Sequence, residues 1–186
     1  MDNLIALVNK NDEVIGFDEK QHVHIKGLLH RAFSIFVFNT MGDMLIHRRA
    51  YEKYHSPGLW TNACCSHLTK GLVMEEAIHV RLNDEMGFDT KLSYIKKFHY
   101  NIEFDNGLTE NEIDHIYIGT YNNNPKPNPE EVSDYAWVNP EMLKRDINEN
   151  PENYTYWLKH IMANYFNDIE NALQEIFEKQ VNSTVQ

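Results

Sequence analysis

Cysteine is scarce in this chain of 186 residues, and its only two copies, Cys64 and Cys65, are neighbours. A disulfide between adjacent residues strains the geometry of the bond, so the sequence predicts two free thiols, the state that a reducing cytoplasm maintains. One of the two is a candidate for reactivity, although a buried and inert cysteine is the commoner case.

Long apolar runs are absent as well. No segment approaches the roughly 18 consecutive apolar residues that a membrane-spanning helix needs, and the N-terminus Met-Asp-Asn-Leu-Ile lacks a signal-peptide pattern. We therefore expect a cytoplasmic protein without a membrane partner.

Positively charged residues are few: the chain has 17 Lys and Arg but 28 Asp and Glu, which gives a formal net charge of −11. General binding to nucleic acids or to anionic membranes requires a positive surface field, so the composition argues against both. An anionic small molecule remains compatible with this charge, provided that cations are concentrated at its site.

The hydrophobic pattern predicts an α+β domain, or an α/β sandwich, in which mixed or antiparallel sheets are flanked by helices. One domain over residues 1–186 is expected from the length, with a frayed tail over about 181–186. Residues 32–49 are expected to form a hairpin, residues 57–71 a loop, and Gly87 a helix cap. The predicted strands are 4–8, 13–17, 32–39, 44–49, 91–104, 113–121 and 135–138, and the predicted helices are 73–86, 140–146 and 154–179.

The two thiols lie in the stretch Pro-Gly-Leu-Trp-Thr-Asn-Ala-Cys-Cys-Ser-His, residues 57–67. It places an indole, a thiol and the imidazole of His67 close together in sequence. This combination is unusual for a segment that only connects two elements, and it makes the stretch the first candidate for a functional site.

Two pairs of charged residues are further candidates. Arg81 and Glu85 are four residues apart on a predicted helix and share a face, although a surface ion pair is the favoured interpretation of that spacing alone. Glu110 and Glu112 share one face of a strand, where two close carboxylates need a cation or a shared proton. A solvated turn edge is the commoner explanation of such a pair.

His24, His30 and His67 form the last candidate group. Together with the two carboxylates they are the ligand types that suit a divalent transition metal. A single histidine is more often structural or exposed, and the separations in sequence do not establish that these three converge.

In this order and spacing, the motifs resemble those of the type I isopentenyl-diphosphate isomerases, a family of the Nudix fold superfamily. The resemblance extends over about residues 3–165. It rests on Leu29-His30-Arg31-Ala32-Phe33, Arg48-Arg49-Ala50, Ser56-Pro57-Gly58-Leu59-Trp60-Thr61-Asn62, Cys64-Cys65-Ser66-His67, Asp84-Glu85-Met86-Gly87 and Glu110-Asn111-Glu112.

The resemblance implies a reversible isomerisation of isopentenyl diphosphate to dimethylallyl diphosphate, a step of isoprenoid precursor biosynthesis. Cys65 and Glu112 are implied to be the catalytic acid/base groups on opposite faces of the substrate, with Tyr100 hydrogen-bonded to the glutamate. Such chemistry needs two proton-transfer groups, because an unactivated alkene is a weak base and its protonation leaves a tertiary carbocation.

The same resemblance implies two divalent cations. The implied site for Mn²⁺, Mg²⁺ or Zn²⁺ consists of His24, His30, His67, Glu110 and Glu112, with His24 preferred to His22. Glu85 is implied to hold the Mg²⁺ that accompanies the diphosphate. The implied substrate-binding residues are Lys20, Arg49, Lys53 and Arg81 for the diphosphate and Trp157 for the hydrocarbon part.

A Nudix-type diphosphate hydrolase is the main alternative. By resemblance, that chemistry uses a helix with Arg-Glu at its centre and paired glutamates one turn later. Here Val80 and Arg81 stand at the Arg-Glu positions and Leu72 at another expected acid, so the isomerase is favoured. A catalytically inactive diphosphate sensor is a third class.

One motif departs from the family pattern. The segment His67-Leu68-Thr69-Lys70-Gly71-Leu72 replaces the usual His-Pro-x-x-Gly-Glu, although it removes none of the matched ligands. The sequence leaves open the identity of the metal, the oligomeric state, the role of the C-terminal helix, and which of Cys65 and Glu112 donates a proton first.

Overall fold

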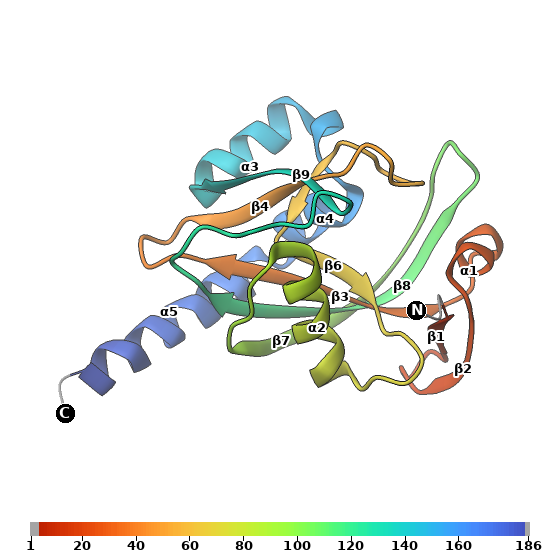
Figure 1. Cartoon of the computed structure of the whole chain (residues 1–186), viewed down its shortest axis with the longest axis horizontal. Coiled ribbons are helices and arrows are strands. Elements are labelled where there is room, and N and C mark those ends of the chain that lie inside the picture. The colour runs from red at the N-terminus through yellow and green to blue at the C-terminus, as the bar shows by residue number, and fades with distance from the viewer. Residues whose placement is uncertain (1–3, 185–186) are drawn as a thin grey trace.

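Nine strands and five α-helices form the fold, which we describe from a computed structural model for residues 4–184 (Figure 1). The strands are β1 (Leu4–Val8), β2 (Val14–Glu19), β3 (His30–Phe38), β4 (Met44–Arg49), β5 (Trp60–Asn62), β6 (Cys64–His67), β7 (Leu92–Glu103), β8 (Thr109–Thr120) and β9 (Val132–Val138). The helices are α1 (Lys20–Lys26), α2 (Met74–Met86), α3 (Pro140–Glu149), α4 (Tyr156–Asn164) and α5 (Phe166–Thr184), with a short 3₁₀ helix, η1 (Pro151–Asn153), before α4.

Strand β3 is the centre of the fold, as its nearly continuous apolar sequence predicts. It pairs in parallel with β8 from His30↔Glu112 to Phe38↔Thr120, and β7 lies antiparallel on the far side of β8. The other edge of β3 pairs with β6, from Ala32↔His67 to Ile35↔Cys64. Strand β6, which carries Cys65 and His67, and strand β8, which carries Glu110 and Glu112, therefore flank β3.

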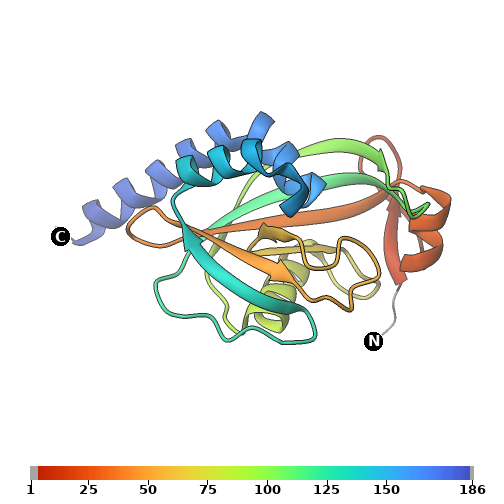
Figure 2. The same ribbon diagram turned by 90° about the horizontal axis from the view of Figure 1, so that it is seen from above.

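Two apolar cores lie on opposite sides of these strands. One joins β3 residues such as Ile35 to Leu82 and Met86 of α2, and the other joins Phe36 to Leu158 and its neighbours on α4 and α5. Figure 2 shows the C-terminal helices on one side of the strands and α2 on the other. This arrangement confirms the predicted α+β fold with a mixed sheet between helices.

The hairpin predicted over residues 32–49 is confirmed only at its turn. Strands β3 and β4 share the single pair Phe38↔Met44, because β8 and β6 take up the edges of β3. Strand β4 pairs instead with β9 and β5.

Two predicted segments differ in the structure. The loop expected over residues 57–71 contains β5 and β6, since pairing with β3 satisfies the backbone of β6. The helix expected over residues 154–179 is divided at Tyr165 into α4 and α5, so that both Ile161 and Ile169 reach the same core.

The ends of the helices are partly as predicted. Gly87 has a φ of 71° and caps α2 in the left-handed conformation that glycine favours. Helix α1 was not predicted, and α5 continues to Thr184 through part of the expected frayed tail, of which residues 185–186 lie outside the described residues. None of the described helices has the length and apolar character to cross a membrane.

Candidate active site

The register of four strands brings the predicted site residues to one face. Tyr100 of β7 lies opposite Glu112 of β8, which in turn lies opposite His30 of β3. On the other edge of β3, Ser34 lies opposite Cys65. Because side chains of directly opposed residues share a face of the sheet, the thiol and the carboxylate project to the same side from either flank of β3.

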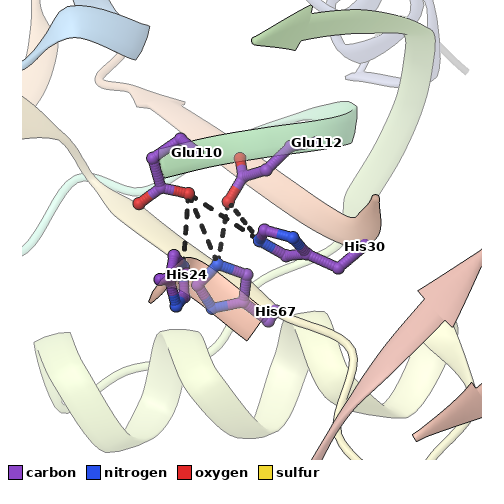
Figure 3. Close-up of side chains that lie close together, drawn as sticks. All are labelled: His24, His30, His67, Glu110 and Glu112. Atoms are coloured by element: carbon purple, nitrogen blue, oxygen red, sulfur yellow. Dashed lines mark hydrogen bonds and ion pairs between the residues drawn. The ribbon is translucent and has the colours of Figure 1, made fainter. Parts of the chain in front are cut away.

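Five ligand-type side chains converge at one end of this face (Figure 3). One potential ligand atom from each lies within 4.8 Å of those of the others, and all five residues are buried. The group consists of His24, His30, His67, Glu110 and Glu112. The pair of carboxylates is therefore no solvated turn edge, and the three histidines do converge.

The contacts within this cluster link β8 to three other elements. The Oε1 atom of Glu112 lies 2.8 Å from Nε2 of His67 and 3.1 Å from Nε2 of His30. The Oε2 atom of Glu110 lies 3.3 Å from Nε2 of His24. His22, by contrast, is half exposed and pairs with Asp18. The α1 helix thus directs His24, and not His22, into the cluster.

The donor set fits a divalent metal. In His24 and His30 the Nδ1 atom lies 2.6 Å and 2.8 Å from the carbonyl oxygens of Lys20 and Leu28, which leaves each Nε2 as a lone-pair donor. Within residues 4–184, the Nε2 of His24 and the Oε2 of Glu110 are buried without a hydrogen-bond partner. Buried polar atoms are rarely left so, and a cation between them would satisfy both.

The pKa values of Glu110 and Glu112 are shifted in opposite directions by their surroundings. Burial and the neighbouring charge of Glu110 raise the pKa of Glu112 to about 7. Burial also opposes charge on Glu110, but contacts with Glu112 and the three histidines hold its pKa well below the usual range. Glu112 is therefore the carboxyl of the pair that can hold a proton near neutral pH.

Tyr100 supports Glu112 from β7. Its hydroxyl donates to Oε2 of Glu112 at 2.7 Å, on the oxygen that does not face the histidines. Burial raises the pKa of Tyr100 well above its usual value, so the phenol remains a donor.

The thiol of Cys65 is held by polar groups. It donates to Oδ1 of Asn62 at 2.9 Å, and the indole Nε1 of Trp157 donates to its sulfur at 3.0 Å. The amide nitrogen of Asn62 donates to the carbonyls of Ile35 and Cys64, each at 3.0 Å, which turns its oxygen towards the thiol. Burial raises the pKa of Cys65 to about 12, so the group is a protonated thiol rather than a nucleophilic thiolate.

Cys64 lies on the other face of β6. It is fully buried in the core that contacts α2, and both cysteines are free, as predicted. The alternation of side chains along a strand therefore separates a structural cysteine from one that lines a cavity.

A cavity between these elements contains the predicted residues of both ends of the site. Its lining includes Cys65, Glu112, Tyr100 and Trp157 together with the four predicted cations Lys20, Arg49, Lys53 and Arg81. Four of the 17 Lys and Arg side chains of this net negative chain thus line one cavity. His24 and His30 are not part of this lining, but they contact Glu110 and Glu112, which are.

The cations are held in place by carboxylates and backbone groups. Arg81 lies 2.5 Å from Glu85, which is only 5% exposed and lines the cavity, so the interpretation as a surface ion pair is wrong. Lys53 pairs with Glu131, which also lies 3.5 Å from Arg81. Burial lowers the pKa of Lys20 to about 8 against the attraction of Glu110.

Several residues of the site were missed by sequence reasoning. Asn62 belongs to the quoted Thr-Asn segment, so its position three residues before Cys65 was the available signal. Ser34 donates to the buried Asp114 at 2.8 Å, and strand alternation could have indicated the face of each residue but not their contact. No pattern singled out Glu131 or His55, because both depend on contacts over long sequence separations.

Comparisons with known proteins agree with this geometry. Residues 28–158 match the NUDIX domain model. The chain is 48% identical over 171 residues to isopentenyl-diphosphate Delta-isomerase 2 of Photorhabdus laumondii, covering 91% of this chain and 97% of that protein. It is 43% identical over 162 residues to isopentenyl-diphosphate Delta-isomerase of Serratia proteamaculans, covering 87% and 90%.

Solved structures support the fold. DR0079 from Deinococcus radiodurans has a TM-score of 0.72 at 21% identity over 86% of this chain and 97% of its own. A MutT protein from Methanosarcina mazei has a TM-score of 0.62 at 16% identity over 77% of this chain and 95% of its own. On the strength of the domain match and of the two relatives above 40% identity, the chain belongs to the isopentenyl-diphosphate Delta-isomerase family within the Nudix superfamily.

Proposed function

We propose that this enzyme interconverts isopentenyl and dimethylallyl diphosphate, with Cys65 and Glu112 as its two proton-transfer groups. The observation that carries the assignment is their placement. The buried thiol of Cys65 on β6 and the carboxyl of Glu112 on β8 line one cavity from opposite flanks of β3. Two such groups, one on each side of a carbon skeleton, are what a double-bond shift requires.

The reaction balances with one proton gained and one lost. Towards dimethylallyl diphosphate, a proton adds to the terminal methylene carbon, the branched carbon becomes a tertiary cation, and a proton leaves the carbon next to the oxygen-bearing methylene. One of Cys65 and Glu112 gives up the first proton and the other takes the second. Their roles exchange when the reaction runs backwards.

Trp157 contributes by excluding water from the cationic carbon. It is 4% exposed and lines the cavity beside the thiol, and the guanidinium of Arg49 lies 5.4 Å from its ring centroid. An indole is a non-nucleophilic wall that tolerates positive charge.

The histidine and glutamate cluster is proposed to hold a divalent metal through His24, His30, His67, Glu110 and Glu112. Three imidazole nitrogens favour Mn²⁺ or Zn²⁺ over Mg²⁺, which prefers an all-oxygen shell. When bound, such an ion would offset the repulsion between the two carboxylates and favour the charged form of Glu112. The residues themselves orient Glu112, because Tyr100 holds its second oxygen.

The diphosphate is proposed to bind at the other end of the cavity, with Lys20, Arg49, Lys53 and Arg81 as cations and Glu85 as the ligand of an accompanying Mg²⁺. A diphosphate carries about three negative charges, and charge-assisted hydrogen bonds from such donors are short and strong. Substrate binding then has to displace the present pairing of Lys53 with Glu131.

The hydrolase is the weaker candidate. Among the described residues, α2 lines the cavity with one cation and one carboxylate, Arg81 and Glu85, whereas the exposed Val80 takes the place of the box arginine. Several carboxylates from α2 would be needed to gather metal ions around an attacking water.

Incubation of the purified enzyme with isopentenyl diphosphate in D₂O tests the proposal. Formation of dimethylallyl diphosphate with deuterium in its methyl groups is the expected result. Release of phosphate or a monophosphate would instead establish the hydrolase, and binding without turnover would establish a sensor.

A further inference from the structure

His55 is a buried histidine for which the proposed reaction has no role. It lies in the segment between β4 and β5, is 5% exposed, and lines the cavity. Its ring stacks on Phe104 with centroids 6.1 Å apart and meets the ring of Trp157 edge-on at 5.8 Å. A buried polar ring between two aromatic side chains needs partners for both nitrogens.

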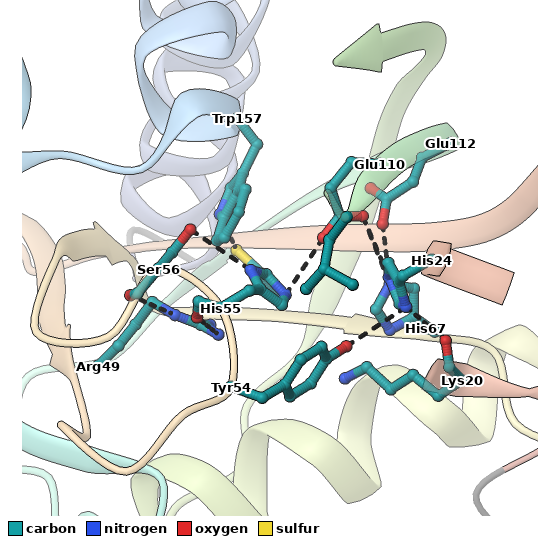
Figure 4. A network of polar contacts seen from close by, with 12 residues as sticks. Lys20, His24, Arg49, Tyr54, His55, Ser56, His67, Glu110, Glu112 and Trp157 are labelled. Carbon is teal, nitrogen blue, oxygen red and sulfur yellow. Dashed lines mark hydrogen bonds and ion pairs between the residues drawn. The ribbon is translucent and has the colours of Figure 1, made fainter. Parts of the chain in front are cut away.

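Both nitrogens have a polar partner (Figure 4). The Nε2 atom lies 3.2 Å from Oε1 of Glu110, and the Nδ1 atom lies 3.3 Å from the hydroxyl of Ser56. A carboxylate oxygen can only accept, whereas a serine hydroxyl can donate. The arrangement that satisfies every group has Ser56 donating to Nδ1, so that the ring proton is on Nε2 and faces Glu110.

Glu110 therefore divides its two oxygens between different neighbours. Its Oε2 faces His24 at 3.3 Å and His30 at 3.7 Å inside the ligand cluster, and its Oε1 faces His55 on the outside. The terminal torsion of a glutamate is broad, so the carboxylate plane is not fixed by the side chain itself. A donor on the outer oxygen is what fixes it here.

The segment that carries His55 is itself held by Arg49. Its Nη2 donates to the carbonyl of His55 at 3.2 Å and its Nε to the carbonyl of Ser56 at 3.1 Å. Ser56 adopts a φ of 48°, a left-handed conformation that few residues other than glycine take up. A strained backbone conformation persists only where the surrounding structure imposes it. Here the conformation of Ser56 directs the carbonyl groups of His55 and Ser56 towards the guanidinium of Arg49.

We propose that His55 is a positioning residue of the metal site, whose Nε2–H donates to Oε1 of Glu110 so that Glu110 presents Oε2 alone to the ion. The inference rests on the proposed metal site. It adds a residue that touches neither the ion nor the reacting carbons and acts through Glu110. Groups behind a metal ligand typically change metal affinity by about 10- to 100-fold.

Two substitutions of His55 distinguish the effect of losing the hydrogen bond to Glu110 from the effect of losing the packing of the ring. His55→Gln retains a nitrogen donor near the position of Nε2, whereas His55→Asn has its amide nitrogen near the position of Nδ1 and is too short to reach Glu110. The control is His79→Gln, because His79 is a partly exposed residue of α2 that pairs with Asp89 and is not part of the cavity lining.

The measurement is Mn²⁺ binding to the stripped full-length protein without substrate, followed by the electron paramagnetic resonance signal of free Mn²⁺. We expect His55→Asn to bind Mn²⁺ about tenfold more weakly or worse, and His55→Gln and His79→Gln to remain within about threefold of the wild type. In turnover with Mn²⁺ present at saturating concentration, KM should change less than kcat in His55→Asn.

Each outcome decides the question. Wild-type affinity in a folded His55→Asn protein overturns the inference and leaves the metal site standing. Equal losses in the Asn and Gln variants also overturn it, since packing alone would then be responsible. If the wild type binds no Mn²⁺, or if His67→Leu binds it as well as the wild type, the proposed metal site itself fails and the inference fails with it.

Discussion

The indole nitrogen of Trp157 lies 3.0 Å from the sulfur of Cys65, although 92 residues separate them in the chain. The same nitrogen lies 2.8 Å from the hydroxyl of Thr61. Helix α4 thus reaches across the cavity to Cys65, the proposed proton-transfer group on β6. A tryptophan that would be expected only to shield the substrate with its ring also orients the thiol through its edge.

Trp157→Phe should slow turnover while preserving an aromatic wall. The variant loses a neutral hydrogen bond of about 1 kcal/mol, so kcat should fall by roughly fivefold to tenfold. Trp137→Phe is the matched control, because Trp137 packs partly buried against the other core. Steady-state kinetics check the prediction, and an equal decrease in both variants would contradict it.

The two cysteines should differ sharply in function. Cys65→Ala should reduce turnover to near the detection limit, because it removes one of the two proposed proton-transfer groups, and general acid or base groups contribute about 10²- to 10⁴-fold. Cys64→Ala should retain most activity, since Cys64 is buried in the core beside α2. Circular dichroism first confirms that both variants are folded, and steady-state kinetics then compare their activities. Comparable activity in the two variants would contradict the proposed role of Cys65.

Tyr100→Phe should affect the chemical step more than substrate binding. A hydrogen bond to a charged group contributes about 1.5–3 kcal/mol, so kcat should fall roughly 10- to 100-fold with little change in KM. The hydroxyl favours the charged form of Glu112, and its loss should raise the pKa of that carboxyl. In pH–rate profiles, the limb that depends on Glu112 should therefore move to higher pH. Tyr117→Phe, in the other core, should leave the limb unmoved.

Metal removal should destabilise the protein. A ligand present at 1,000 times its dissociation constant stabilises the folded state by about 4 kcal/mol, which corresponds to roughly 10 °C in Tm for a chain of this size. Thermal melts with Mn²⁺ and with EDTA measure the difference. It should vanish in His67→Leu, which lacks a cluster ligand, and persist in His79→Leu. If the difference in Tm between Mn²⁺ and EDTA were equally large in His67→Leu, the stabilisation would come from another site.

The metal-free protein should lose stability in acid through His47. Burial lowers the pKa of His47 to about 3 in the folded state, below its ordinary value of 6.5. The unfolded chain therefore binds the extra proton between pH 6.5 and 3, and stability falls as the pH drops through that window, by up to about 1.4 kcal/mol per pH unit. Above pH 6.5 this residue contributes no pH dependence.

His47→Asn isolates that contribution. The amide of asparagine can replace the donor that contacts the carbonyl of Ala63 at 3.1 Å, but it does not titrate. Urea unfolding in EDTA at pH 5 and pH 7 should show a smaller difference in the variant than in the wild type. An unchanged difference would mean that other groups dominate acid unfolding.

Local patterns were enough to predict α2 with its Gly87 cap and the apolar strand β3, because both depend on neighbours in sequence. They were insufficient for β6, whose four residues become a strand only through pairing with β3. They also predicted one helix over residues 154–179 and missed its division at Tyr165, because α4 ends there through packing against the core and no proline or glycine marks the position.

The sequence by itself determined the family, the two unpaired thiols, and the residue types of the site, since these follow from composition and from motifs with a nearly fixed spacing. Only the tertiary structure decided that Glu85 is buried and that His24 rather than His22 joins the cluster. It also decided that His55 faces Glu110. The alternation of a strand fixes which face a side chain takes, but the partner on that face depends on long-range register, such as the pairing of His30 with Glu112.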